Sequence, residues 1–66
     1  MLKVLEKIGS NKKVIEILRS YGWKGKSGAF AMQKHRENLM PDVALILWDY
    51  CNKHNIPVSI DDFKGD

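Results

Sequence analysis

The chain has 66 residues, of which 44% are hydrophobic and 29% are charged, and its formal net charge at pH 7 is +3. This composition is too apolar for a disordered tail and is typical of one small globular domain, which we expect to span residues 1–66. The single cysteine, Cys51, excludes an internal disulfide, and the longest apolar run, Val43 to Trp48, is far shorter than the roughly 20 residues that span a bilayer. No signal-peptide pattern opens the chain, so a cytoplasmic protein without a membrane partner is expected.

Two helices are predicted in the first third of the chain. Leu2, Leu5 and Ile8 recur at helical spacing, and Gly9 ends that pattern. Ser10 or Asn11 is a suitable N-cap for a second helix. Its apolar residues follow at i, i+3, i+4 and i+7, namely Val14, Ile17, Leu18 and Tyr21. Gly22 supplies the end of this helix.

The segment from Trp23 to Lys26 is predicted to be a turn, in which Gly25 adopts the positive φ that a sharp reversal needs. Ser27 is expected to cap a third helix that contains Ala29 and Phe30 and ends near Asn38. Two helices around a glycine-rich turn form the pattern of a helix-turn-helix. That motif is used mainly to place its second helix in the major groove of DNA.

Pro41 suits the first turn of a fourth helix, which is predicted to run to about Lys53. The tail has two interpretations. Ile56, Val58 and Ile60 alternate as in a strand, whereas the segment 59–63, Ser-Ile-Asp-Asp-Phe, is typical of an N-capped helical turn, which we favour. The predicted fold class is therefore all-α, a compact four- to five-helix bundle that contains a helix-turn-helix and ends in a short strand or helical turn.

The two signs of charge are segregated along the chain. From Met1 to Arg36 there are nine basic residues against two acidic ones, whereas from Glu37 to Asp66 there are two basic residues against six acidic ones. The basic half contains the helix-turn-helix pattern. Such an asymmetry is expected of a protein that places one side on a polyanion, and its simpler alternative is a solvated lysine-rich surface.

The chain resembles the small phage Cro and repressor DNA-binding domains, which are similar to YdaS-type regulators. The resemblance covers nearly the whole chain and is carried by Ile8-Gly9-Ser10, Val14 to Leu18, Gly22-Trp23, Ala29-Phe30 and Leu39-Met40-Pro41. It implies that Leu18 packs on the third helix and that Phe30 anchors the third helix as the recognition helix. The interval from Gly22 to Phe30 is about two residues longer than usual for a helix-turn-helix. Gln33 stands where that family commonly has an aromatic residue.

Candidate DNA contacts cluster at the turn and along the third helix. A reading helix needs a short polar N-terminal end that reaches bases, and flanking cations that bind phosphate. Ala31 and Met32 are expected to contact thymine methyl groups if Phe30 faces inward. The full set comprises Lys24, Lys26, Ser27, Gly28, Ala31, Met32, Lys34, His35 and Arg36. Each has a plainer interpretation: the lysines and His35 as solvated residues, Ser27 as an N-cap, and Met32 as a core or dimer contact.

The fourth helix has more apolar residues than one face needs, so part of its surface is expected to be covered by a second copy. A homodimer would also offset the small core of a 66-residue chain. The predicted interface consists of Ile46, Tyr50, Val58 and Ile60. A two-fold dimer would present two recognition helices roughly 34 Å apart to a near-palindromic double-stranded operator.

Enzymatic activity has the least support. The sequence contains no nucleophile paired with a base, no phosphate-cradling glycine loop and no cluster with metal-ligand spacing, so no catalytic residue, metal, cofactor or small-molecule substrate is predicted. The alternative to a DNA-binding regulator is a small protein-binding module, such as a phage-encoded inhibitor or an antitoxin. It would act through the acidic, apolar C-terminal half of the chain.

Overall fold

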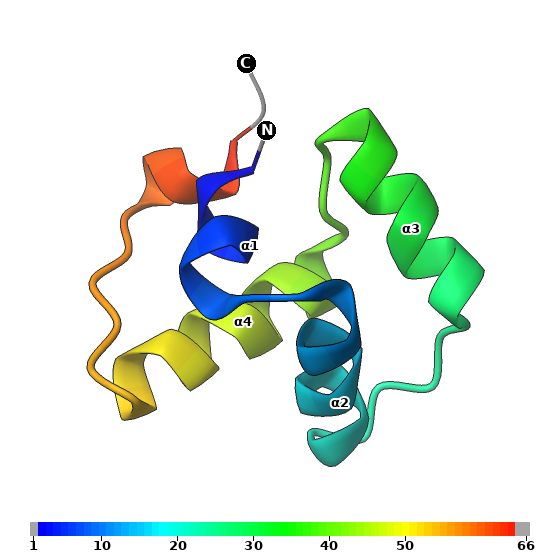
Figure 1. Cartoon of the computed structure of the whole chain (residues 1–66), viewed down its shortest axis with the longest axis horizontal. Coiled ribbons are helices and arrows are strands. Elements are labelled where there is room, and N and C mark those ends of the chain that lie inside the picture. The colour runs from blue at the N-terminus through cyan, green and yellow to red at the C-terminus, as the bar shows by residue number, and fades with distance from the viewer. Residues whose placement is uncertain (1, 65–66) are drawn as a thin grey trace.

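A computed structural model describes residues 2–64, which form four α-helices and a final 3-10 turn (Figure 1). The helices are α1 (Lys3–Ile8), α2 (Asn11–Ser20), α3 (Ser27–Arg36) and α4 (Pro41–Lys53), and the turn is η1 (Ile60–Phe63). The described residues contain no strand, so the all-α class is confirmed for them. No helix within this range is long and apolar enough to cross a membrane.

The predicted helix boundaries are largely correct because their capping residues act locally. Ser10 is the N-cap of α2, and its hydroxyl accepts a hydrogen bond from the amide of Lys13 at 3.3 Å. Pro41 is the first residue of α4. A backbone N–H at that position has no partner within a helix, so the N–H that proline lacks costs no hydrogen bond. Gly22 follows the end of α2 with φ of +88°, and the amides of Gly22 and Trp23 bond back to Arg19 and Leu18. These two bonds form a Schellman motif.

Three local predictions are wrong. Gly25 does not adopt a positive φ, because the chain reverses at Gly22, directly after the α2 C-cap. Ser27 is the first residue of α3 and does not cap it; Lys26 is the N-cap and forms no side-chain cap bond. The third helix ends at Arg36 rather than near Asn38, because Glu37 turns into the left-handed region with φ of 54°.

The C-terminal segment forms the helical turn that the sequence favoured over a strand. The amide of Ser59 donates to the carboxylate of Asp62 at 2.9 Å, one half of a capping box. Phe63 packs back against Trp48 of α4, with ring centroids 5.7 Å apart. A single antiparallel bridge between Asn38 and Lys64 joins this end of the chain to the α3–α4 connection.

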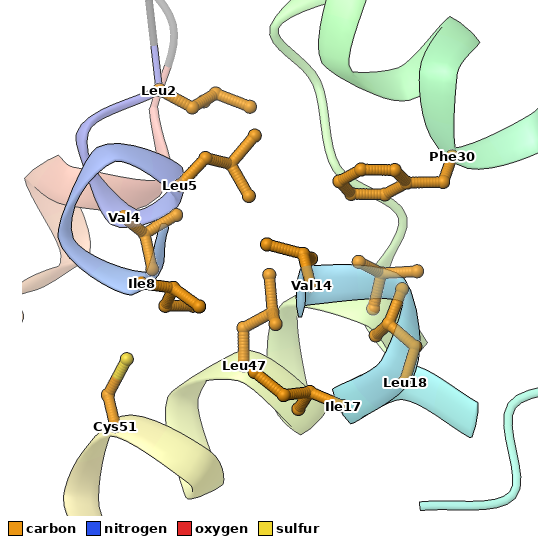
Figure 2. Packing of buried hydrophobic residues seen from close by; sticks show 11 residues of the cluster. Leu2, Val4, Leu5, Ile8, Val14, Ile17, Leu18, Phe30, Leu47 and Cys51 are labelled. Atoms are coloured by element: carbon orange, nitrogen blue, oxygen red, sulfur yellow. The ribbon is translucent and has the colours of Figure 1, made fainter. Parts of the chain in front are cut away.

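The hydrophobic core lies between α1, α2 and α4 (Figure 2). Val14 and Leu18 of α2 and Leu47 of α4 are fully buried and face one another there. Cys51 of α4 is buried in the same cluster. Helix α3 contributes one buried residue, Phe30, whose ring points from α3 toward the cluster. This arrangement leaves α3 on the outside of the molecule (Figure 1).

Candidate nucleic-acid interface

Helix α3 combines a single apolar anchor with a broad exposed surface. Phe30 is 1% exposed, whereas Ala31, Met32, His35 and Arg36 are all exposed to solvent. This result follows from the sequence SGAFAMQKHR, which carries no apolar stripe at helical spacing beyond Phe30. The outward position of Ala31 and Met32 was predicted on the condition that Phe30 faces inward, and the structure meets that condition.

The surface of α3 and the segment before it carry only one sign of charge. From Ile17 through Arg36 the chain contains no aspartate or glutamate, and Lys34, His35 and Arg36 occupy the last turn of α3. Basic residues at that end also offset the negative end of the helix dipole. At the other end, Ser27 and Gly28 are exposed in the first turn.

The connection from α2 to α3 spans residues 21–26 and displays two of the predicted phosphate ligands. Lys24 and Lys26 are both exposed, and neither forms an ion pair with any residue of the described range. They therefore keep their full charge available to an anionic partner. The connection is longer than the three or four residues of a tight helix-turn-helix, as the interval from Gly22 to Phe30 indicated.

Lys34 differs from its predicted role. It was expected on the solvent-facing side of the third helix, but its side chain is half-buried and donates a hydrogen bond to the Asn11 side chain at 2.7 Å. This bond brings the C-terminal half of α3 beside the N-terminus of α2. Lys12 and Lys13 follow Asn11 and are exposed, so they extend the basic surface. Sequence analysis did not propose them as contacts, although two lysines directly after an N-cap are a usable signal.

Two lysines outside α2, α3 and their connection form ion pairs. Lys7 of α1 pairs with Asp62 of η1 at 2.8 Å, and Lys53 pairs with Asp49 within α4 at 3.1 Å. Figure 1 shows η1 on the opposite side of α1 from α3. The lysines of the α2–α3 connection, Lys24 and Lys26, are thus unpaired, whereas Lys7 and Lys53 are paired with acidic residues.

The four residues predicted to form a dimer interface differ in how far they are exposed. Ile46, Tyr50 and Val58 are half-buried and pack against the core of their own chain. Ile60 is 68% exposed. It borders an apolar hollow of about 170 Å³ lined by Ala44, Leu45, Trp48, Ile60 and Phe63. Leu45 and Trp48 were missed, although their i, i+3 spacing places them on one face of a helix.

No group of three His, Cys, Asp or Glu side chains within residues 2–64 is arranged to hold a metal ion. Burial raises the pKa of the Cys51 thiol, and the nearby Lys7 opposes this shift. An open hollow of about 410 Å³ lies between α3 and the start of α1 and α2, lined by Leu2, Asn11, Ala31, Lys34, His35 and Glu37.

Comparisons with known protein families, with curated proteins and with solved structures found no match to this chain.

Proposed function

We propose that this protein is a sequence-specific double-stranded DNA-binding regulator of transcription that places α3 in the major groove, in the manner of a Cro-like phage repressor. One observation supports this most directly. Helix α3 buries one side chain, Phe30, in the core and presents an exposed face without acidic residues beside unpaired lysines. An α-helix fits the major groove, and an acid-free face approaches phosphate without repulsion.

The proposed contacts divide into two kinds. Lys24, Lys26 and Arg36 bind phosphate oxygens and fix the position of the helix on the duplex. Ser27, Gly28, Ala31, Met32 and His35 face the bases from the exposed side of α3. The apolar members of this set favour contacts with thymine methyl groups and recognition of groove shape, since α3 has no asparagine, and its one glutamine is engaged elsewhere.

In this arrangement Gln33 forms a hydrogen bond within the protein and is not a DNA contact. Its side-chain oxygen accepts a hydrogen bond from the backbone amide of Met40 at 2.9 Å. That bond ties α3 to the start of α4, at a position where the resembling family commonly has an aromatic residue. Gln33 replaces an apolar contact with a polar one that fixes the connection after α3.

A second copy is proposed to cover the apolar hollow bordered by Leu45 and Ile60. Leu45 is 69% exposed, and the residues that line the hollow are all apolar. Burying them offsets the small core of the chain. A two-fold dimer would present two copies of α3 to a near-palindromic operator in the cytoplasm.

The alternative function is a protein-binding module, and the same hollow favours it. The hollow adjoins η1, which carries the exposed carboxylate of Asp61, so an apolar segment with a flanking basic residue would also fit this surface. The two proposals differ in the side of the molecule they use. DNA binding depends on α3 and the lysines before it, whereas this alternative depends on α4 and η1.

The proposal is tested by removing Lys24 and Lys26 together. Each variant is titrated against duplex DNA selected by the parent chain from a random pool, at several salt concentrations. Lys24→Ala with Lys26→Ala is expected to weaken binding by at least about tenfold and to lower the slope of log K against log salt by about 2, because two phosphate contacts are lost.

The matched control is Lys3→Ala with Lys64→Ala, which removes the same charge from two exposed lysines outside α2, α3 and their connection. It is expected to retain most of the affinity and the full salt slope. Equal losses in the two double variants would show attraction by net charge alone. No enrichment of any sequence by the parent chain would overturn the proposed function and favour the protein-binding alternative.

A further inference from the structure

Trp23 is the most restrained residue of the connection between α2 and α3. Its amide donates to the carbonyl of Leu18 at 3.0 Å, and its own carbonyl accepts from Arg19 at 3.4 Å. The indole Nε1 donates to the carboxylate of Asp42, in the first turn of α4, at 3.2 Å. The Arg19 guanidinium lies 5.6 Å from the centroid of the ring. These contacts attach the connection to both α2 and α4.

Gly25 lies directly against this indole. A Cβ atom at position 25 would stand 2.2 Å from Cζ2 of Trp23, a distance at which the ring has to move. Gly25 is therefore needed because the Trp23 ring occupies the space of a side chain, and not because of its backbone dihedral angle. The segment alternates: Trp23 and Gly25 meet on the inner side, while Lys24 and Lys26 are exposed.

We propose that Trp23 is the positioning residue of the DNA interface. Its indole holds the long connection in one conformation, so that Lys24 and Lys26 are ordered before DNA arrives. This inference rests on the proposed function and adds the means by which a connection longer than a tight turn presents its cations. A connection ordered in advance avoids the entropy cost of ordering on binding.

The experiment uses Gly25→Ala, which keeps Trp23 and every charge but displaces the ring. Gly28→Ala, used only in the measurement without DNA, is the matched control for the fold, since a Cβ there meets nothing within 4 Å. Each variant is examined first without DNA, by the NMR resonance of the Trp23 indole N–H, assigned with the help of Trp48→Phe. Gly25→Ala is expected to shift this resonance, whereas Gly28→Ala is expected to leave it in place.

The second measurement is DNA affinity across a salt series. Gly25→Ala is expected to weaken binding by about three- to tenfold, which is the loss expected from one or two groups that now have to be ordered. The slope of log K against log salt is expected to stay at the parent value, because both lysines still reach phosphate. Trp23→Phe, which keeps a ring but removes the Nε1 donor to Asp42, is expected to act in the same direction.

The outcomes separate the two proposals. A parent chain that binds no duplex DNA overturns the proposed function, and the indole resonance of Gly25→Ala then still reports whether the ring controls the connection. A parent chain that binds DNA no more tightly than Gly25→Ala overturns the positioning role and leaves DNA binding intact. The positioning role is also overturned if Gly25→Ala leaves the indole resonance unshifted. It is likewise overturned if Gly25→Ala lowers the slope of log K against log salt as much as the double lysine variant does.

Discussion

The ammonium nitrogen of Lys7 lies 2.8 Å from a carboxylate oxygen of Asp62, and this ion pair joins the first helix of the chain to its last turn. Lys7 also donates to the carbonyl oxygen of Pro57 at 2.7 Å, and the same Asp62 oxygen accepts from the amide of Ser59. Asp62 is 7% exposed, so its charge is satisfied largely by these partners. The buried carboxylate of Asp62 thereby holds η1 against α1.

This pair predicts a loss of stability in acid. Lys7, and then the Ser59 amide, hold the pKa of Asp62 below its usual value. A carboxylate whose folded pKa is depressed stabilises the fold above its unfolded pKa of about 3.9, and that contribution disappears as the pH falls through the folded pKa. The thermal midpoint of the parent chain is expected to fall between about pH 6 and about pH 2.5.

Asp62→Asn is expected to lower the midpoint at neutral pH and to flatten this acid dependence. Asp49, whose pKa is lowered by hydrogen bonds from Tyr21 and Lys53, leaves a residual slope. Asp61→Asn changes an exposed neighbour and is the control. An acid dependence that is identical in the parent and in Asp62→Asn would contradict the role assigned to the ion pair.

Phe30 is predicted to contribute most of the packing energy between α3 and the hydrophobic core. Phe30→Ala is expected to lower the free energy of unfolding by about 3–5 kcal/mol, because it removes the only buried side chain of the helix and leaves a cavity. Phe30→Leu is expected to cost less than about 1.5 kcal/mol. Met32→Ala, at a position that is 51% exposed on the same helix, is expected to stay within about 0.5 kcal/mol of the parent. Urea unfolding measures the free energy of unfolding of all three variants. Similar losses in Phe30→Ala and Met32→Ala would contradict the role of Phe30 as the buried anchor of α3.

Two glycines are predicted to respond to alanine in opposite directions. Gly22 has φ of +88°, so Gly22→Ala is expected to destabilise the protein by about 1–2 kcal/mol even though the space around it is open. Gly28 lies inside α3 with nothing near its absent Cβ, and Gly28→Ala is expected to stabilise the protein by up to about 1 kcal/mol. Thermal unfolding distinguishes the two. Changes of the same sign would mean that the reversal does not occur at Gly22.

The proposed dimer is tested at Leu45. The parent chain is expected to sediment with about twice its 7.6 kDa mass, and Leu45→Glu is expected to sediment as a single chain while keeping its helical circular dichroism. Met32→Gln alters an exposed apolar residue on α3, outside the hollow, and is expected to leave the mass unchanged. A parent chain that stays at the mass of one copy at every concentration would exclude the dimer.

The helices and their ends were predictable where the signal is local. Ser10, Gly22 and Pro41 act on the backbone within a few residues, and the structure uses each of them as the sequence indicated. Gly25 was misassigned because its role depends on a tertiary contact, whereas nothing in the structure explains why Lys26 rather than Ser27 is the N-cap of α3. Gly25 is set by the indole of Trp23, and that ring is in turn placed by Asp42 of α4.

The candidate site was predictable in its location and less so in its details. The cationic, acid-free segment identified the surface around α3, and Phe30 was correctly chosen as the inward residue. The half-buried position of Lys34 and its bond to Asn11 join residues that are 23 positions apart. No spacing rule describes such a pair. The apolar surface of α4 was expected, but its centre lies at Leu45 and Trp48 because Ile46 and Tyr50 turn toward the core.

The sequence by itself determined the all-helical class, the boundaries of most helices, the buried residues Val14, Ile17 and Leu18 of α2, and the separation of the two signs of charge along the chain. These properties follow from periodicity, from capping chemistry and from composition, all of which act within a few residues. Only the tertiary structure decided which cations remain unpaired and which face of α4 stays exposed. Those outcomes depend on which side chains meet across the fold, as Lys7 meets Asp62 and Trp23 meets Asp42.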